Sequence, residues 1–183
     1  MKKCKMMHGP AGMTLVELVT GLAILGVLAA IGMPGILGSI QRTGVDGASR
    51  RLAEDIRRAQ SNALTRGVQA RLIVFDKTGV LPTTPTPIND STKANMYRIE
   101  IRSGAAASWP ALTDTPGSNA NVLTEWSDLG TQYRAVWVDT GNAVLFNSIG
   151  GLINTTVPAT IVVQGSGGTR SVQTNAIGKA TIL

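Results

Sequence analysis

Thiol and imidazole side chains, which carry much of enzyme and metal chemistry, occur only before position 13. The only cysteine, Cys4, and the only histidine, His8, both fall in this short segment. From residue 13 onward the chain therefore lacks the material for a disulfide, a thiolate metal site or a histidine-based mechanism. Carboxylates remain, but no spacing of Asp and Glu fixes two of them together for acid–base work. We expect no enzyme, no metal and no cofactor.

The net charge of +6 is a weak indicator of nucleic acid binding. Half of it comes from Lys2, Lys3 and Lys5, and from residue 13 onward 14 basic side chains stand against 11 acidic ones. A surplus of this size does not by itself define a nucleic-acid-binding surface. The length of 183 residues fits one domain with a substantial core and a helical extension.

A single carboxylate, Glu17, stands at the start of a long apolar segment. Residues 18–41 contain no charged side chain, and about 20 apolar residues suffice for a helix to cross a bilayer. We expect a membrane-spanning helix over residues 13–41, which include this run. Because lysines precede it and positive flanks stay in the cytoplasm, the rest of the chain is expected in the periplasm. A charge toward the centre of a membrane costs about 3 kcal/mol, so such a carboxylate usually has a function.

An ordinary secretory signal is the alternative interpretation of this region. The small residues of Leu28-Ala29-Ala30 offer a cleavage site for it. This alternative does not account for Glu17. It also leaves unexplained why apolar residues continue to Ile40, well beyond the usual signal core of about 7 to 15 residues.

The segment GMTLVE at residues 12–17, with the apolar run that follows it, resembles the leader of type IV pilins and type II secretion pseudopilins. The resemblance implies that residues 1–12 are removed by a prepilin peptidase, which cuts between Gly12 and Met13. It also implies methylation of the new amino group of Met13 and a role for Glu17 in assembly. Pro34 falls where this family commonly has a helix-kinking proline. Met13 departs from the phenylalanine that is most usual there.

Elementary electrostatics gives Glu17 a specific partner. A carboxylate in an apolar bundle needs an opposite charge, and the amino-terminal ammonium of Met13 on a neighbouring subunit supplies one. Further along, Pro34 removes a backbone hydrogen bond and adjacent glycines weaken the helix, so we expect a kink or local unwinding between residues 32 and 38.

The remainder, residues 42–183, has the pattern of an α+β domain. Apolar residues in steps of three and four predict an amphipathic helix to about residue 66, ended by Gly67. The opposite face of this helix is basic, which fits either a face exposed to solvent or a face that binds an acidic partner. Seven short β-rich runs follow, and they indicate a mostly antiparallel sheet: 70–75, 97–102, 134–138, 143–146, 160–164, 170–174 and 180–183. The alternation in 97–102 predicts one solvated face, and residues 80–95 and 103–121 read as surface loops.

The carboxyl-terminal third resembles the end of the GspH/FimT pseudopilin family. The resemblance lies in residues 146–150, 160–164 and 170–174 and in the pair Gly178-Lys179. It implies a β-sandwich packed on the long helix and a minor subunit of either a type II secretion pseudopilus or a type IV pilus. Expected partners are other pilins or pseudopilins, the inner membrane and the assembly platform. Both filament systems remain open.

DNA binding for natural transformation is the alternative function. Family members with that role share a terminal Gly-Arg-x-Arg motif, whose guanidinium groups hold phosphates. The matching residues here are Gly178-Lys179-Ala180-Thr181, which keep one cation. Arg170 would add a second contact if its strand lies beside Lys179; otherwise both side chains are simply solvated.

Overall fold

The computed structural model describes residues 13–82, 87–153 and 158–183, without side chains at 32–37 and 40. The chain divides into two compact units, 1–38 and 39–183, which are treated separately below. Gly12, and with it the expected cleavage site, lies outside the described residues.

Helix α1 runs from Leu15 to Arg66. It is helical through residues 32–38, so the predicted unwinding there is wrong, while the kink at Pro34 stays a prediction. Over the described residues, no helix has both the length and the apolarity that a membrane crossing needs. The predicted membrane span is therefore not confirmed.

The part of α1 that belongs to the second unit carries the predicted apolar stripe. Six side chains at helical spacing are at most 2 % exposed: Val45, Ala48, Leu52, Ile56, Ala59 and Ala63. Gly67 ends the helix with φ of +63°, a left-handed conformation that glycine adopts without a steric penalty. The prediction of an amphipathic helix to about residue 66 is confirmed.

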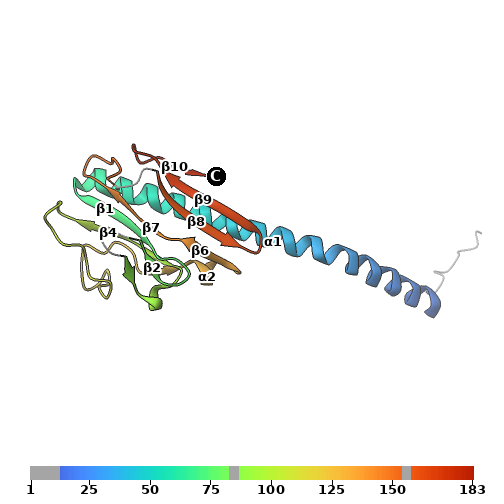
Figure 1. Ribbon diagram of the computed structural model, residues 1–183. Coiled ribbons are helices and arrows are strands. Elements are labelled where there is room, and N and C mark those ends of the chain that lie inside the picture. The colour runs from blue at the N-terminus through green and yellow to red at the C-terminus, as the bar shows by residue number, and fades with distance from the viewer. Residues whose placement is uncertain (1–12, 83–86, 154–157) are drawn as a thin grey trace, which may run out of the picture. The chain divides into compact units, whose positions relative to one another are not determined.

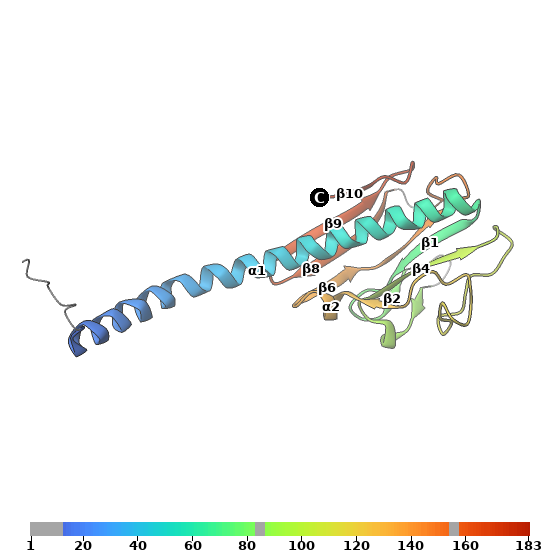
Figure 2. The same ribbon diagram turned by 180° about the vertical axis from the view of Figure 1, so that it is seen from behind.

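Two four-stranded antiparallel sheets pack on this part of α1. The first has the order β5-β4-β1-β7, and the second has the order β10-β9-β8-β6. Figures 1 and 2 show α1 crossing a face of both sheets, and one hydrophobic cluster joins residues of the helix and of the two sheets. The strands of the first sheet are Ser127–Asp128 (β5), Met96–Arg102 (β4), Gln69–Val74 (β1) and Asn142–Phe146 (β7). Those of the second are Ala180–Ile182 (β10), Gly168–Thr174 (β9), Ala159–Gly165 (β8) and Val136–Thr140 (β6).

The predicted count of seven strands is wrong. Each of the seven predicted runs overlaps a strand, but the described residues also form β5 and a small separate sheet of β2 (Val80–Leu81) and β3 (Ile88–Asn89). A 3₁₀ turn η1 (Ser91–Lys93) and a short helix α2 (Leu129–Gln132) complete the elements. Strands of two residues leave no alternation in a sequence, which is why they were not predicted.

The face of β4 that was predicted to be solvated is instead buried. Arg98 and Glu100 are both fully buried, because the segment 103–126 crosses over them. The Arg98 guanidinium donates to the carbonyl oxygens of Ala111 at 2.8 Å and Asp114 at 2.7 Å, and it lies 4.4 Å from the ring centre of Trp126. Residues 103–121, predicted to be a surface loop, therefore cover one face of the first sheet.

Candidate functional site

Thr14 and Glu17 form a capping box at the start of α1. The amide nitrogen of Thr14 donates to Glu17 Oε2 at 2.9 Å, and the amide nitrogen of Glu17 donates to Thr14 Oγ1 at 3.2 Å. Two amide groups that begin a helix without intrahelical partners are satisfied in this way. The Thr-x-x-Glu spacing of residues 14–17 is the sequence signature of this capping box, and the cost of a charge in a membrane does not predict it.

The first turns of α1 are apolar on every side and exposed. Between residues 13 and 31, Glu17 is the only charged residue, and its carboxylate is engaged by Thr14. Apolar surface of this extent marks a site of interaction with protein or membrane. Each of the following side chains is more than half exposed: Met13, Leu15, Val16, Leu18, Val19, Leu22, Ile24, Leu25, Val27, Leu28 and Ile31.

The two candidate DNA contacts are not brought together. Strands β9 and β10 are neighbours, as the hypothesis required, but Asn175 pairs with Lys179 at one end. Arg170 lies five residues further along β9, which corresponds to about 17 Å at a strand rise of about 3.3 Å per residue. The Arg170 guanidinium donates to Asp46 Oδ1 at 2.9 Å, whereas the Lys179 side chain is exposed.

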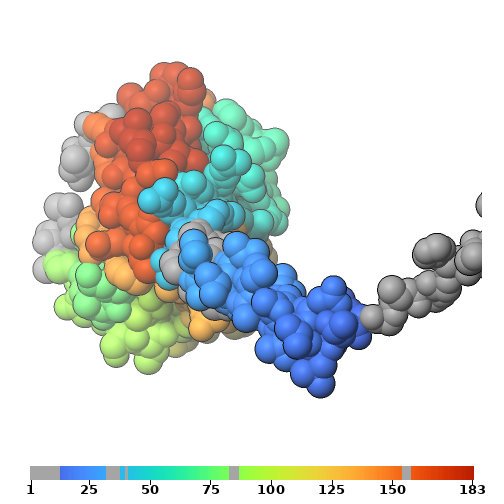
Figure 3. Space-filling view, turned by 90° about the vertical axis from the view of Figure 1, so that its right-hand side faces the viewer, coloured from blue at the N-terminus to red at the C-terminus, as the bar shows by residue number. Residues whose placement is uncertain are grey.

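Arg170 instead belongs to a shallow hollow of about 330 Å³ where the β8–β9 turn meets α1. Arg42, Asp46 and Thr169 line it together with Arg170. A Cβ at Gly167 would stand 2.4 Å from the Arg42 amide nitrogen, so glycine is required for this close approach. Figure 3 looks onto this end of the second unit, where the orange-red turn lies against the helix. The Asp46 carboxylate partly neutralises the hollow, so it is a poor phosphate site.

The buried carboxylate Glu100 has no free oxygen for acid–base chemistry. Its Oε1 accepts from Arg98 Nε at 2.6 Å, and its Oε2 accepts from Arg71 Nε at 2.6 Å. Trp109 covers the Arg71 guanidinium at 4.3 Å, and burial lowers the pKa of Arg71. Over the residues the structure describes, no group of three or more His, Cys, Asp and Glu side chains is placed to hold a metal. The network of Arg98, Glu100 and Arg71 therefore holds the segment 103–126 on the first sheet.

The fold is that of a solved pilin. The chain is similar to the type IV minor pilin FimU of Pseudomonas aeruginosa strain PAO1 in a crystal structure in space group P21. That match has 17% identity and a TM-score of 0.50, over 78% of this chain and 90% of that one. A second crystal form of FimU, in space group P65, matches at 14% identity with a TM-score of 0.45, over 75% of this chain and 91% of that one.

The family follows from the sequence of the second unit. Residues 48–178 match the family described as type II transport protein GspH, and the chain belongs to this family. No curated protein sequence matches it. The expectation of a GspH/FimT-like minor pilin is confirmed.

Proposed function

We propose that this chain is a minor subunit of a periplasmic pilus-like filament and helps to prime or cap its assembly. Membership of the GspH family supports the class. The observation that carries the proposal is the amino-terminal part of α1, whose apolar side chains are exposed around a single carboxylate. Such a surface is unfavourable in water and favours a place where lipid or other apolar helices cover it, as in a filament core.

The expected order of events begins with removal of residues 1–12 by a prepilin peptidase. The cut between Gly12 and Met13 creates a new ammonium group on Met13, one residue before Thr14. Glu17 then pairs with the Met13 ammonium of a neighbouring subunit, and opposite charge sets the position of one helix against the next. The apolar side chains pack around this pair in the filament core.

Two filament systems use subunits of this class, and the chain serves one of them. In a type II secretion system it would act in the pseudopilus that drives folded proteins outward. In a type IV pilus it would act in priming of the fibre. DNA uptake is not proposed, because Arg170 is paired with Asp46 and lies at the opposite end of β9 from Lys179.

The proposal is tested by the location of the full-length chain in its own cells. Surface filaments are sheared from the cells, periplasmic filaments are released by opening the cell envelope, and both are probed for the chain. A deletion strain is assayed for both surface pili and secreted proteins. We expect the chain at a small fraction of the main subunit, and loss of one of the two outputs on deletion. A chain absent from the filaments, with both outputs unchanged in the deletion strain, would contradict the proposal.

A further inference from the structure

Two turns at one end of the second unit share the pattern Asn-x-Ile-Gly. The first is Asn147 to Gly150, and the second is Asn175 to Gly178. In each, the glycine amide donates to the asparagine carbonyl oxygen at 2.9 Å, and the glycine has a positive φ, +75° and +84° respectively. Each asparagine side chain also accepts a backbone amide that follows the turn. The two turns are built alike, and each is closed by its own hydrogen bonds.

One side chain of α1 holds both turns. Gln60 Nε2 donates to the carbonyl oxygen of Gly150 at 2.8 Å and to that of Ile177 at 2.9 Å. Both acceptors are carbonyl oxygens, so only the amide nitrogen with its two hydrogens fits between them. The Leu152 amide donates to the Ala176 carbonyl oxygen at 3.0 Å, which joins the turns directly.

This framework presents apolar side chains to solvent. Ile149 is 80% exposed and Ile177 is 72% exposed, each at the third position of its turn. Leu64, one helical turn after Gln60, is 52% exposed and lies against Gly150. Single exposed apolar residues are common, but three of them on turns and a helix joined through Gln60 mark an interaction surface. We call Leu64, Ile149 and Ile177 the isoleucine platform.

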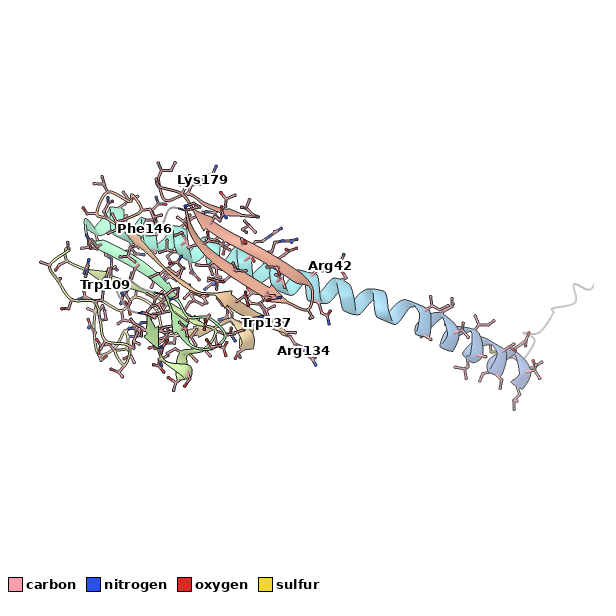
Figure 4. The ribbon with its side chains drawn as sticks, in the orientation of Figure 1. Arg42, Trp109, Arg134, Trp137, Phe146 and Lys179 are labelled. Carbon is pink, nitrogen blue, oxygen red and sulfur yellow. The ribbon has the colours of Figure 1, made fainter. Side chains whose placement is uncertain are left out.

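The charge around the isoleucine platform points to the kind of partner. Residues 57–64 of α1 and the turn segments 147–151 and 175–179 contain no acidic residue. Their cations include Lys179 and Arg57, and Arg57 shares a face of α1 with Gln60 and Leu64 by helical spacing. In Figure 4, Lys179 and Arg42 lie well apart on the second unit. Two platforms of two copies would bring like charges together, which disfavours a symmetric contact between copies.

We propose that the isoleucine platform docks a different pilin-like subunit, through a surface that combines apolar side chains with carboxylates. The identity of the partner as a filament subunit rests on the proposed function; the platform itself does not involve the amino-terminal helix. Contact through the isoleucine platform would give this chain a second defined neighbour, in addition to the subunit that pairs with Glu17. Specificity would come from the partner's carboxylates facing Arg57 and Lys179.

The test uses the full-length chain in its own cells, with a photo-crosslinking residue in place of Ile149 or of Ile177. The control carries it at Ser166, an exposed residue of the β8–β9 turn at the other end of β9. We expect adducts with one other pilin-like subunit from positions 149 and 177 and not from 166. Adducts with a second copy of the chain, or the same adducts from all three positions, would overturn the proposal.

A paired variant tests whether the surface matters for assembly. In Ile149→Asp/Ile177→Asp both platform isoleucines become acidic, and the matched control is Ser166→Asp. With equal amounts of folded chain in the cells, the double variant is expected to fall about tenfold in isolated surface or periplasmic filaments, as loss of a contact worth about 1.4 kcal/mol would produce. Unchanged incorporation overturns the proposal. Failure of the proposed function is distinguishable, since the unaltered chain would then be absent from filaments too.

Discussion

Thr14 and Glu17 bind each other in both directions, with the Thr14 amide nitrogen 2.9 Å from Glu17 Oε2 and the Glu17 amide nitrogen 3.2 Å from Thr14 Oγ1. The carboxylate proposed to pair with a neighbouring subunit therefore already has a partner in the isolated chain. Pairing with an ammonium would add an opposite charge, which neutral hydrogen bonds do not provide. The capping box would keep the Glu17 carboxylate at the helix start until the ammonium group of a neighbouring subunit binds it.

Substitution at these two positions separates capping from charge. Glu17→Gln retains a residue suited to the capping box but removes the charge, whereas Thr14→Ala removes the cap and keeps the charge. We expect Glu17→Gln to lower incorporation into filaments by about tenfold or more, the equivalent of about 1.4 kcal/mol, and Thr14→Ala to lower it much less. Quantitative immunoblotting of isolated surface and periplasmic filaments measures both. Equal losses would show that helix capping, not charge, is what Glu17 contributes.

The buried network around Glu100 is expected to dominate the stability of the first sheet. Glu100→Gln leaves Arg98 and Arg71 buried without a counter-charge, and breaking a buried pair in this way costs about 3–5 kcal/mol. Urea unfolding of the full-length chain in detergent, followed by tryptophan fluorescence, reports the change, because Trp109 and Trp126 lie over these arginines. Glu125→Gln, at an exposed carboxylate, is the control. Similar midpoints for both variants would contradict the account of this network.

Gly178 is expected to be intolerant of any side chain. Its φ is +84°, and a Cβ would stand 2.2 Å from Gln60 Nε2 and 2.8 Å from the Gly150 carbonyl oxygen. Gly178→Ala is thus predicted to lower the free energy of unfolding by about 1–3 kcal/mol, from backbone strain and displacement of Gln60. Gly104→Ala, where a Cβ meets nothing within 4 Å, should change it little in the same urea measurement. Equal midpoints would show that Gln60 does not hold the turn.

The helix and the larger strands could be predicted because their patterns are local. The stripe from Val45 to Ala63 repeats at helical spacing, and positive φ at Gly67 follows from its lack of a Cβ. The alternation in 97–102 was also read correctly as a strand. Whether its polar face meets water or a loop depends on where residues 103–126 fold, and alternation carries no information about that.

The remaining features, namely the hollow at Arg170 and the paired turns, depend on contacts between residues far apart in the sequence. Arg170 and Asp46 are 124 residues apart, and Gln60 reaches a carbonyl 117 residues away. No spacing in the sequence predicts such pairs. The Asn-x-Ile-Gly pattern occurs twice in the sequence. The sequence does not show that the two turns lie side by side, because that depends on the contact of both turns with Gln60.

The most direct test of the filament-subunit proposal is the mass and amino-terminal sequence of the chain recovered from filaments and from membranes, in cells with and without the prepilin peptidase. The account predicts that the filament-associated chain begins at N-methylated Met13, and that without the peptidase the chain keeps residues 1–12 and is absent from filaments. A chain that begins near Ile31, or one that is untrimmed in both strains, would contradict it.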